Sequence, residues 1–551
     1  MRAQRHCKRL ALGLLLVAGG CSRGCKPSAD SQPRAAAPAR AHGGRLVVGL
    51  PEEPDQLNML GRATRATRLV TNCIFSRFVT WDDSLQLVPD LITEIPTHEN
   101  GGISADDLTY TYHLRHDVHW HDGPLLTSAD VRFTYDVIMD SSTATEVRPS
   151  WEVVAACTTP DSFTVVFRLA QPYAAFVSDA FSDEDVLPQH LLAGFTGAKF
   201  QSAPFHHAPV GSGPFRFKEW VAGSYLAVVR NDAYYKGAPP LDEIAFKFVP
   251  DANALALQLQ SGAVQVVDGA EPAQMPILVQ RPDIRVLQST SFSFDQLTFQ
   301  CTDPILRDVR VRRALAAATD RATLAKNVYE GFAVPAYSEA HPRVPWHEAA
   351  GDTANAYDPA RAAALFEAAG WHATGNGIRA RDHRPLRLVI TTMAGRAVRE
   401  RVEAVLQQEW RAVGVELAIS NCSPPEFFDK LTTGKFQIAL FGFQQEPDPA
   451  PMDQVYGSRF TPENGQNFAR FSDARVDSLL EAGKHERNRE RRWTLYRDVE
   501  RILGETQPLL PLVWLTELDV VPRALHGYRP NPTSAGDTYN VDEWWLEPST
   551  P

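Results

Sequence analysis

The sequence predicts a mixed α/β protein built from several domains. Its 551 residues exceed one ordinary domain and indicate roughly three or four core-forming units. A hydrophobic content of 44% with 22% charged residues is typical of a globular protein with a sizeable core, and not of a membrane or disordered protein. Short alternating strands fill the first half, and helices that alternate with strands fill the second half. Both kinds of element should therefore contribute to the core.

In the first half, apolar residues alternate with polar ones, which predicts strands with one buried face. The mature protein should begin with a strand over 46–50 that stops at Pro51. Further strands are expected over 108–114, 118–120, 163–169, 215–217, 225–229 and 244–248.

Helices are predicted where a capping residue precedes an apolar pattern of helical spacing. Thr127 opens one such helix, and Asp251 precedes another. Asp358 fits the cap of a third helix, with Pro359 at its first position and Gly370 at its C-terminal stop.

After about Ser291 the helices alternate with strands. Apolar residues at helical spacing run from Val398 to Val413 and end at Gly414, before a predicted strand over 415–419. This alternation predicts βαβ units with parallel strands, and hence a doubly wound domain.

The N-terminus has the pattern of an export signal. Basic residues precede an apolar run from Leu10 to Gly20, about half the ~20 residues that a membrane-spanning helix needs. We therefore expect a signal peptide over 1–20. The small residues before Cys21 resemble a lipobox, in which that cysteine is acylated; the alternative is an ordinary signal peptide that ends near a chance cysteine. The stretch 21–43, rich in Ala, Pro, Ser and Arg, predicts a flexible tether.

Charge and motif content exclude several classes of function. A formal charge of −11 attracts no nucleic acid.

The cysteines beyond Cys21 are Cys25, Cys73, Cys157, Cys301 and Cys422. They lack metal-ligand spacing, and the sequence does not assign the partners of a disulfide among them. Catalytic motifs of hydrolases and NTPases do not occur, and Gly211-Ser212-Gly213 predicts a tight turn rather than a nucleophile. An exported hydrolase remains the rival class.

Several blocks of sequence, in order, resemble the extracytoplasmic solute-binding proteins of family 5. These are the large dipeptide- and oligopeptide-binding receptors of ABC importers. The strongest block is Ser104-Ala105-Asp106-Asp107-Leu108-Thr109-Tyr110-Thr111-Tyr112-His113-Leu114-Arg115, followed by 118–123 and 127–131. Later blocks occupy 211–215, 230–235, 257–262, 309–315 and 320–321. The resemblance covers nearly the whole chain after the tether.

This resemblance implies a type II periplasmic-binding-protein fold, with two lobes joined by a hinge plus an extra α/β domain. Lobe I should combine 44–81, 204–290 and 518–551, the extra domain should be 82–203, and lobe II should be 291–517. The resemblance further implies a monomeric, membrane-anchored periplasmic receptor that delivers a peptide or peptide-like solute to permease subunits. It implies no enzymatic activity, cofactor or nucleic-acid partner. The alternative ligands are a metal chelate, an opine or an oligosaccharide.

The family often places a Trp, followed three residues later by an Asp that pairs with the amino group of the peptide. The corresponding residues here are Phe443 and Glu446, with Asp448 as a competing carboxylate because the loop is one residue shorter. Closure would remove water, and a charge-assisted pair would then offset part of the desolvation. The alternative is a solvated acidic turn.

A second candidate site lies between a predicted strand and a helix N-terminus, at 391–396. Backbone N–H groups, Thr392 and Arg396 could hold a carboxylate there, unless the stretch is only an exposed connection. The sequence also departs from the family pattern in places that leave the ligand open. Leu440 stands where Arg is frequent, Phe443 replaces Trp, and Gln265 stands where Asp is common.

Histidines gather in the strongest block, and His119 and His121 are expected to share one strand face. The family commonly carries aromatic and histidine residues in this segment, so we expect no metal site there. The other members of the group are His113 and His116.

Overall fold

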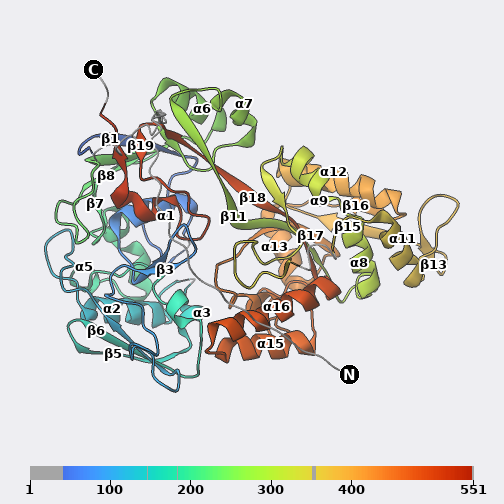
Figure 1. Ribbon diagram of the computed structural model, residues 1–551, viewed down its shortest axis with the longest axis horizontal. Coiled ribbons are helices and arrows are strands. Elements are labelled where there is room, and N and C mark those ends of the chain that lie inside the picture. The colour runs from blue at the N-terminus through green and yellow to red at the C-terminus, as the bar shows by residue number, and fades with distance from the viewer. Residues whose placement is uncertain are drawn as a thin grey trace, which may run out of the picture. The chain divides into compact units, whose positions relative to one another are not determined.

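The computed structural model describes residues 41–548, except for 62, 146, 183, 350–354 and 464. The predicted signal peptide, Cys21 and most of the tether lie outside the described residues. Within the described residues, no helix has the length and apolar character needed to cross a bilayer. Figure 1 gives the arrangement of the elements.

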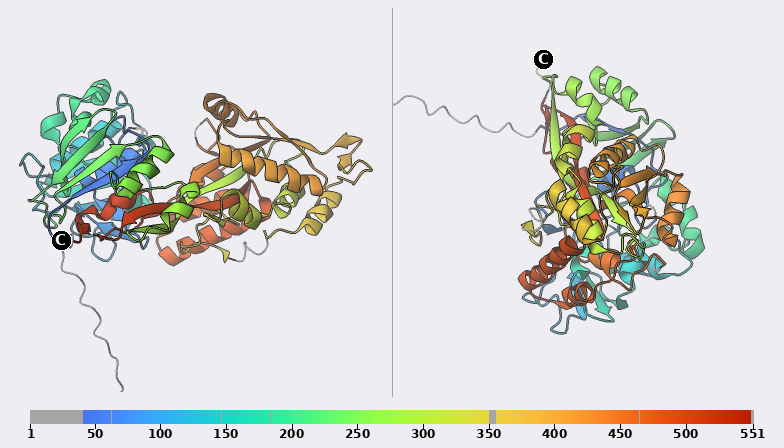
Figure 2. Two further views of the ribbon diagram at one scale, coloured as in Figure 1. Left: turned by 90° about the horizontal axis from the view of Figure 1, so that it is seen from above. Right: turned by 90° about the vertical axis from the view of Figure 1, so that its right-hand side faces the viewer.

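The main sheet has eleven strands, in the order β16-β15-β17-β11-β18-β10-β1-β9-β8-β7, with β12 paired to β18 off this path. At its centre, β11 (Ile284–Phe299) and β18 (Leu509–Pro522) pair in antiparallel fashion. Figures 1 and 2 show these two long strands side by side, in green and red. The predicted lobe boundaries at 290/291 and 517/518 fall inside these strands.

The ladder between β11 and β18 shifts register between Thr290 and Phe294, where β11 carries extra residues. Phe292 lies in this bulge. Its N–H donates to the carbonyl oxygen of Pro532 at 3.2 Å, and its carbonyl accepts from the N–H of Gln445 at 2.9 Å. A bulge bends a strand and re-aims its backbone groups, so here it joins β11 to two distant segments.

On one side of the long pair lie β10 (Val266–Val267), β1 (Arg45–Leu50), β9 (Glu243–Phe248), β8 (Tyr225–Arg230) and β7 (Phe215–Val221). β1 is parallel to both of its neighbours, β10 and β9, whereas β8 is antiparallel to both β9 and β7. Helix α1 (Arg65–Ile74) begins after Thr64, whose side chain accepts from the N–H of Thr67. Helix α6 (Ala252–Ser261) begins at the predicted cap Asp251. The short helices η3 (Pro272–Gln274) and α7 (Met275–Leu278) follow.

On the other side, β15 (Arg387–Thr391) is parallel to both β16 (Glu416–Ile419) and β17 (Ile438–Gln444). Helices α12 (Ala397–Ala412) and α13 (Pro424–Thr433) connect these strands, which confirms the predicted βαβ units. Helix α11 (Pro359–Ala368) begins at the predicted cap Asp358, whose side chain accepts from the N–H of Arg361.

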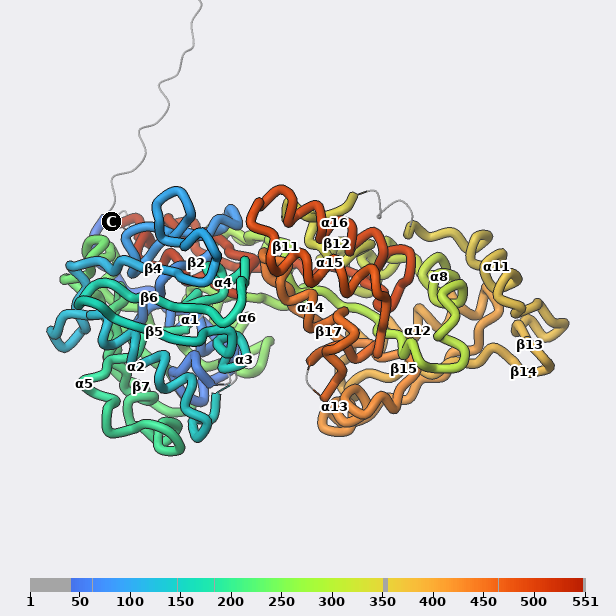
Figure 3. Tube along the Cα trace, turned by 90° about the horizontal axis from the view of Figure 1, so that it is seen from below, coloured from blue at the N-terminus to red at the C-terminus, as the bar shows by residue number. Residues whose placement is uncertain are grey.

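The remaining elements of this side include a helical group that lies together in Figure 3. The group is α14 (Met452–Tyr456), α15 (Ala474–His485) and α16 (Arg489–Thr506). The others are α8 (Val309–Ala317), α9 (Arg321–Thr323), the π-helix η4 (Leu324–Val328), β12 (Ala333–Pro335), β13 (Ala380–Arg381) and β14 (Arg384–Pro385).

A separate three-stranded antiparallel sheet contains β4 (Thr109–His113), β6 (Thr164–Leu169) and β5 (Val154–Asp161). Helix α2 (Ser128–Met139) packs on β5 and β6 and begins with a capping box between Thr127 and Asp130. The buried ring of Trp151 lies 5.6 Å from Phe167 and 4.7 Å from Phe181. The other short elements are β2 (Val79–Trp81), β3 (Leu87–Pro89), α3 (Arg148–Trp151), α4 (Phe176–Asp179), α5 (Gln189–Leu192), η1 (Gly197–Ser202), η2 (Pro204–His207), β19 (Leu525–His526), η5 (Asp537–Glu543) and β20 (Trp545–Leu546).

Two details differ from the sequence expectations. The stretch 118–120 is not a strand, because its only ladder contact is an isolated bridge between His119 and Leu125. The long strands β11 and β18 were not predicted; β18 and the second half of β11 are largely buried on both faces, which hides the alternation that marks a half-exposed strand. The described cysteines carry free thiols; they are Cys73, Cys157, Cys301 and Cys422.

Candidate functional site

A pocket of about 210 Å³ lies where α1 and the C-terminal segment meet the long strands. Residues of 63–69 and 532–536 form one wall, and Ser293, Gln444 and Glu517 form the other. The predicted boundaries place the first wall in lobe I and the second in lobe II. We call this space the interlobe pocket.

Glu446 lies two residues beyond β17 and is half-buried. Its Oε2 accepts a 2.9 Å hydrogen bond from the hydroxyl of Ser534, a residue that lines the interlobe pocket. The structure therefore places this predicted carboxylate beside the pocket, in contact with a residue of the first wall.

Phe443 is the penultimate residue of β17 and lies opposite Phe294 in the ladder with β11. The two rings are 6.2 Å apart in an edge-to-face arrangement. Phe443, Gln444, Glu446 and Pro451 line a second, very small pocket of about 20 Å³. Phe443, the predicted aromatic wall, thus packs against Phe294 in the core and also lines this small pocket.

Asp448 is occupied by a structural ion pair. Its two oxygens accept hydrogen bonds of 2.7 and 2.8 Å from Arg492 of α16. Burial would raise the pKa of Asp448, but the Arg492 guanidinium outweighs burial and holds the pKa below its usual value. Asp448 is therefore held inside the fold by Arg492, whereas Glu446 lies beside the interlobe pocket.

At the second predicted site, Thr392 and the N–H of Gly395 form hydrogen bonds with other groups of the protein. Thr392 is fully buried, and its hydroxyl donates to the carbonyl of Leu440 at 2.8 Å. Arg396 is exposed at the start of α12. The N–H of Gly395, which was expected to hold a carboxylate, donates to Glu400 of the same helix at 2.8 Å. A side chain of α12 thus takes the position proposed for a ligand.

A buried ion pair next to the site was missed by the sequence analysis. Arg399 donates to Oδ1 of Asp295 at 2.9 Å and 3.1 Å, and Tyr329 donates to Oδ2 at 2.6 Å. A Cβ on Gly442 would lie 2.6 Å from the Arg399 guanidinium. The glycine before Phe443 therefore makes room for this pair, and a glycine inside a strand is the signal that could have revealed it.

Two departures from the family pattern have structural roles. Leu440 is a fully buried residue of β17 that packs in the core with residues of β15, so it does not face a ligand. Gln265 accepts from the N–H of Val47 at 2.9 Å. This hydrogen bond joins the residue before β10 to β1. Neither position carries information about the ligand.

A larger cavity of about 890 Å³ lies beyond the small pocket. Residues within 149–179 form one wall, and residues within 450–484 form the other. We call it the distal cavity. Pro451 lines both the distal cavity and the small pocket beside Glu446.

The family model described as "Bacterial extracellular solute-binding proteins, family 5 Middle" matches residues 86–466. The chain belongs to this family. It is an extracytoplasmic solute-binding protein and not an enzyme, and its fold is the predicted periplasmic-binding-protein fold.

Relatives match this solute-binding protein over almost its full length. The oligopeptide-binding protein AppA of Bacillus subtilis (strain 168) is 27% identical over 553 residues, which cover 97% of each chain. The structure of Bacillus subtilis AppA in complex with a nonapeptide has a TM-score of 0.75 at 26% identity and covers 93% of this chain and 100% of that chain. NikZ of Campylobacter jejuni, in complex with Ni(L-His), has a TM-score of 0.74 at 25% identity and covers 91% and 99%.

Beside the interlobe pocket of this solute-binding protein lies a cluster of buried carboxylates around Arg65. Arg65 pairs with Asp268 and Asp537, and with both oxygens of Glu517 at 2.8 and 2.9 Å. Asp519 completes the cluster. Asp268, Asp519 and Asp537 are at most 6% exposed, and each offers an oxygen within 4.8 Å of the others. In the described part of the chain, Arg65 is the only cation within ion-pair distance of Asp268 and Asp537, so it serves as their counter-ion.

One guanidinium cannot balance all of these carboxylates. Asp519 accepts from the N–H of Gly269 at 3.2 Å, but its Oδ2 and the Oδ2 of Asp268 are buried without a hydrogen-bond partner. Burial, and then the charge of Asp268, raise the pKa of Asp519 to about 7. The pKa of Asp537 is raised for the same reasons. The folded protein therefore retains protons that an unfolded chain releases.

We expect this cluster to make the folded protein less stable as pH rises through about 7. A carboxyl whose folded pKa is raised contributes stability that is fully present below its unfolded value of 3.8 and is lost as pH rises through about 7. Asp519→Asn keeps the neutral form at every pH. Its melting temperature should therefore fall less between about pH 6 and about pH 8 than that of the wild type.

Differential scanning fluorimetry across this range measures the effect. Asp232→Asn is the control, because that side chain is 73% exposed in a surface pair with Arg230. If the melting temperature of Asp519→Asn fell with pH as steeply as that of the wild type, the prediction would be contradicted.

The histidine and glycine motifs of the sequence meet in a structural contact. Nδ1 of His121 accepts from the N–H of Gly211 at 3.2 Å, and Nε2 lies 3.0 Å from the carbonyl oxygen of Gly213. Burial lowers the pKa of His121 to about 4, so this ring is neutral. Ser212 is 2% exposed and is not a nucleophile at an open site. The tight-turn interpretation of this motif accounts for these contacts.

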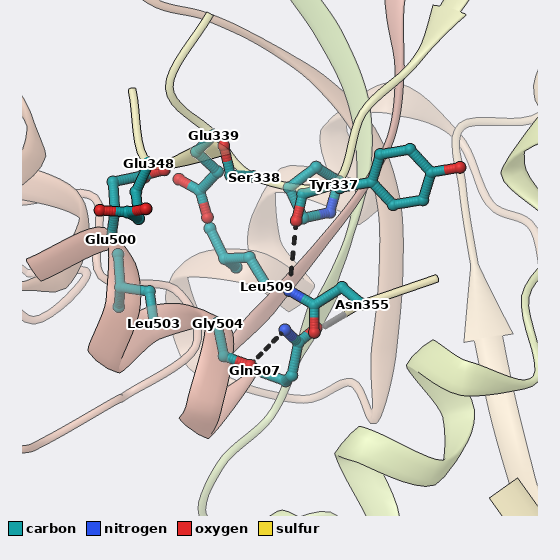
Figure 4. Close-up of a pocket in the computed structure, with 11 residues that line it drawn as sticks. Tyr337, Ser338, Glu339, Glu348, Asn355, Glu500, Leu503, Gly504, Gln507 and Leu509 are labelled. Carbon is teal, nitrogen blue, oxygen red and sulfur yellow. Dashed lines mark hydrogen bonds between the residues drawn. The ribbon is translucent and has the colours of Figure 1, made fainter. Parts of the chain in front are cut away.

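Figure 4 shows a third pocket, in which Glu339, Glu348 and Glu500 face one another. Burial, and then Glu500, raise the pKa of Glu339 well above its usual value. The space is about 20 Å³, which suits about one water molecule, since a water needs on the order of 10–15 Å³. This pocket is too small for a solute.

Proposed function

We propose that this protein is the substrate-binding lipoprotein of an ABC importer and captures a peptide or peptide-like solute between its two lobes. The observation that carries the proposal is the position of Glu446, half-buried beside the interlobe pocket and bonded to Ser534 of its opposite wall. The ligands of relatives support it: AppA was solved with a nonapeptide, and a relative from Pseudomonas aeruginosa is named a di/tripeptide-binding protein.

In this proposal, the lobes keep the predicted boundaries, and β11 and β18 form the hinge between them. Glu446 accepts the ammonium group of the ligand, and Phe443 forms the aromatic wall beside it. Partial removal of water makes the charge-assisted contact stronger than it is in bulk solvent. Acylation of Cys21 anchors the protein to the membrane, and the permease subunits of the importer receive the solute.

Glu446→Gln should weaken the binding of peptides with a free amino terminus by about 10- to 100-fold, since hydrogen bonds to charged groups contribute about 1.5–3 kcal/mol. The amide keeps the shape of the side chain but loses the charge. Isothermal titration calorimetry with one peptide in free and N-acetylated forms measures the effect. The acetylated form should bind the wild type and the variant equally.

Glu416→Gln is the matched control, because Glu416 is an exposed carboxylate paired with Arg387. Unchanged affinity of Glu446→Gln for the free-amino peptide would remove Glu446 from the proposal. A protein that binds no peptide but retains a metal chelate or an opine would overturn the peptide assignment itself.

A further inference from the structure

The carboxylate cluster around Arg65 contains a like-charge pair across two neighbouring strands. Val267 of β10 pairs with Val520 of β18 in an antiparallel ladder. The next residues along the two chains, Asp268 and Asp519, therefore lie opposite each other. Like charges directly opposite one another destabilise a pair of strands, and both of these side chains are almost completely buried. The pair thus favours a positive charge between its members.

Asp537 approaches the same pair from the C-terminal segment. It is the first residue of η5, and its Oδ1 accepts from the N–H of Asn531 at 2.6 Å. Its Oδ2 accepts from the hydroxyl of Tyr528 at 3.2 Å, so the carboxylate is held in place from both sides. One oxygen each of Asp268, Asp519 and Asp537 lies within 4.8 Å of the other two.

These separations meet the distance condition for a shared calcium ion. Ca²⁺ binds oxygen at about 2.3–2.6 Å, so two oxygens on the same ion are at most about 5 Å apart. Three converging carboxylates within that limit can therefore contact one ion together.

Two oxygens of the cluster have no other role. Among the residues that the structure describes, Oδ2 of Asp268 and Oδ2 of Asp519 are buried and receive no hydrogen bond. When ionised, the three aspartates and Glu517 carry four negative charges, whereas Arg65 supplies one positive charge. Buried polar atoms without a partner are rare in folded proteins. A cation that these oxygens share would satisfy both the free atoms and the charge.

The ligand atoms indicate a hard cation, and their burial favours Ca²⁺ over Mg²⁺. Carboxylate oxygens are ligands that both ions prefer. Mg²⁺ usually retains several water molecules and demands near-octahedral geometry, whereas Ca²⁺ accepts six to eight oxygens in flexible arrangements. The three aspartates are at most 6% exposed, which leaves little room for retained water. Arg65 and Glu517 line the interlobe pocket, so the ion reaches the cluster from there.

We propose that Asp268, Asp519 and Asp537 form a binding site for one Ca²⁺ ion beside the interlobe pocket. The ion joins β10 and β18 to the C-terminal segment at η5, and it compensates the negative charge that Arg65 leaves unbalanced. Glu446 is not among the ligands, so binding of the ion does not depend on the identity of the solute.

Calcium chloride alone is the probe, titrated by calorimetry into the full wild-type protein after removal of metals with EDTA. We expect one ion per chain, with a Kd of about 10⁻⁴–10⁻³ M, the range of extracellular calcium-binding modules. Magnesium chloride should bind at least about 10-fold more weakly. Absence of calcium binding would overturn the site, and equal affinity for Mg²⁺ would overturn its assignment to Ca²⁺.

Stability gives a second measure of the same binding. A ligand that binds only the folded state raises the ratio of folded to unfolded protein by the factor 1 + [L]/Kd. At about 10 mM Ca²⁺ this ratio should therefore rise about 10- to 100-fold, as measured by urea unfolding with and without the ion. An unchanged unfolding curve would contradict the proposal.

Substitutions locate the ion. Asp268→Asn and Asp519→Asn each remove one negative charge and keep the shape of the side chain, so each should weaken Ca²⁺ binding by at least about 10-fold. Asp283→Asn is the matched control, because that side chain is 59% exposed in a surface pair with Arg281. It should bind Ca²⁺ as the wild type does. Unchanged affinity in both cluster variants would place the ion elsewhere and refute the site.

Arg65→Met separates an effect of charge from a failure to fold. The substitution removes the cation that competes for the same carboxylates, so the variant should bind Ca²⁺ at least about 10-fold more tightly than the wild type. A damaged fold would weaken binding instead. Unchanged or weaker binding by Arg65→Met, with native circular dichroism, would refute the competition and with it the site. If this variant does not fold, the wild-type titration and the asparagine variants decide.

Discussion

Replacing Arg65 with methionine is expected to lower the free energy of unfolding by about 2–4 kcal/mol near pH 8. Removal of one partner of a fully buried ion pair costs about 3–5 kcal/mol, because it leaves an uncompensated buried charge. Arg65 is 43% exposed, so solvent screening reduces its share. The carboxylates that it leaves behind, those of Asp268, Asp519 and Asp537, are almost completely buried.

The pH dependence of this effect provides its own check. Below about pH 5 the orphaned carboxylates can take up protons, so the destabilisation should shrink. Urea unfolding at both pH values measures it. Arg45→Met is the control, since Arg45 is 55% exposed in its pair with Glu243 and should change stability by less than about 1 kcal/mol. A pH-independent loss for Arg65→Met would mean that lost packing, and not charge, explains the effect.

Gly211→Ala is expected to destabilise the protein by about 3 kcal/mol or more. A Cβ at Gly211 would overlap the backbone carbonyl of Ile74 at the end of α1, and overpacking against a backbone that cannot rotate away forces the chain apart. The same carbonyl accepts from the N–H of Gly213 at 2.8 Å. The substitution would therefore also weaken the contact between α1 and the His121 turn.

Thermal unfolding of Gly211→Ala measures this effect. Gly194→Ala is the matched control, because a Cβ at Gly194 meets no atom within 4 Å and its φ lies outside the left-handed region. Gly194→Ala should be neutral or stabilising by up to about 1 kcal/mol, since alanine restricts the unfolded chain. Equal melting temperatures for the two variants would show that α1 and the turn can move apart at little cost.

Local signals predicted the elements well where capping chemistry marks their ends. The helix after Asp358 and the helix that ends just before Gly414 were predicted because cap and glycine positions follow from backbone sterics alone. Parallel pairing of β15, β16 and β17 followed from helix–strand alternation. These features depend on residues within a few positions of one another.

The charge network could not be predicted, because its members are distant in sequence. Arg65 meets Asp268, Glu517 and Asp537 over separations of more than 200 residues, and Asp448 meets Arg492 over 44. Each of these residues by itself has the pattern of a surface charge. Glu446 was singled out by the family pattern, and only the fold shows that Asp448 already has a partner.

The bulge in β11 sets the alignment of the proposed anchor. Phe292 bonds on one side to Gln445, next to Glu446, and on the other side to Pro532, two residues before Ser534. The extra residues of β11 thus hold two loops that are distant in sequence, at Gln445 and at Pro532, close to each other. A shift of one residue turns side chains to the opposite face of a strand. An insertion or deletion in β11 between Thr290 and Phe294 would therefore move Gln445 and Pro532 out of reach of Phe292 and separate the two halves of the proposed anchor.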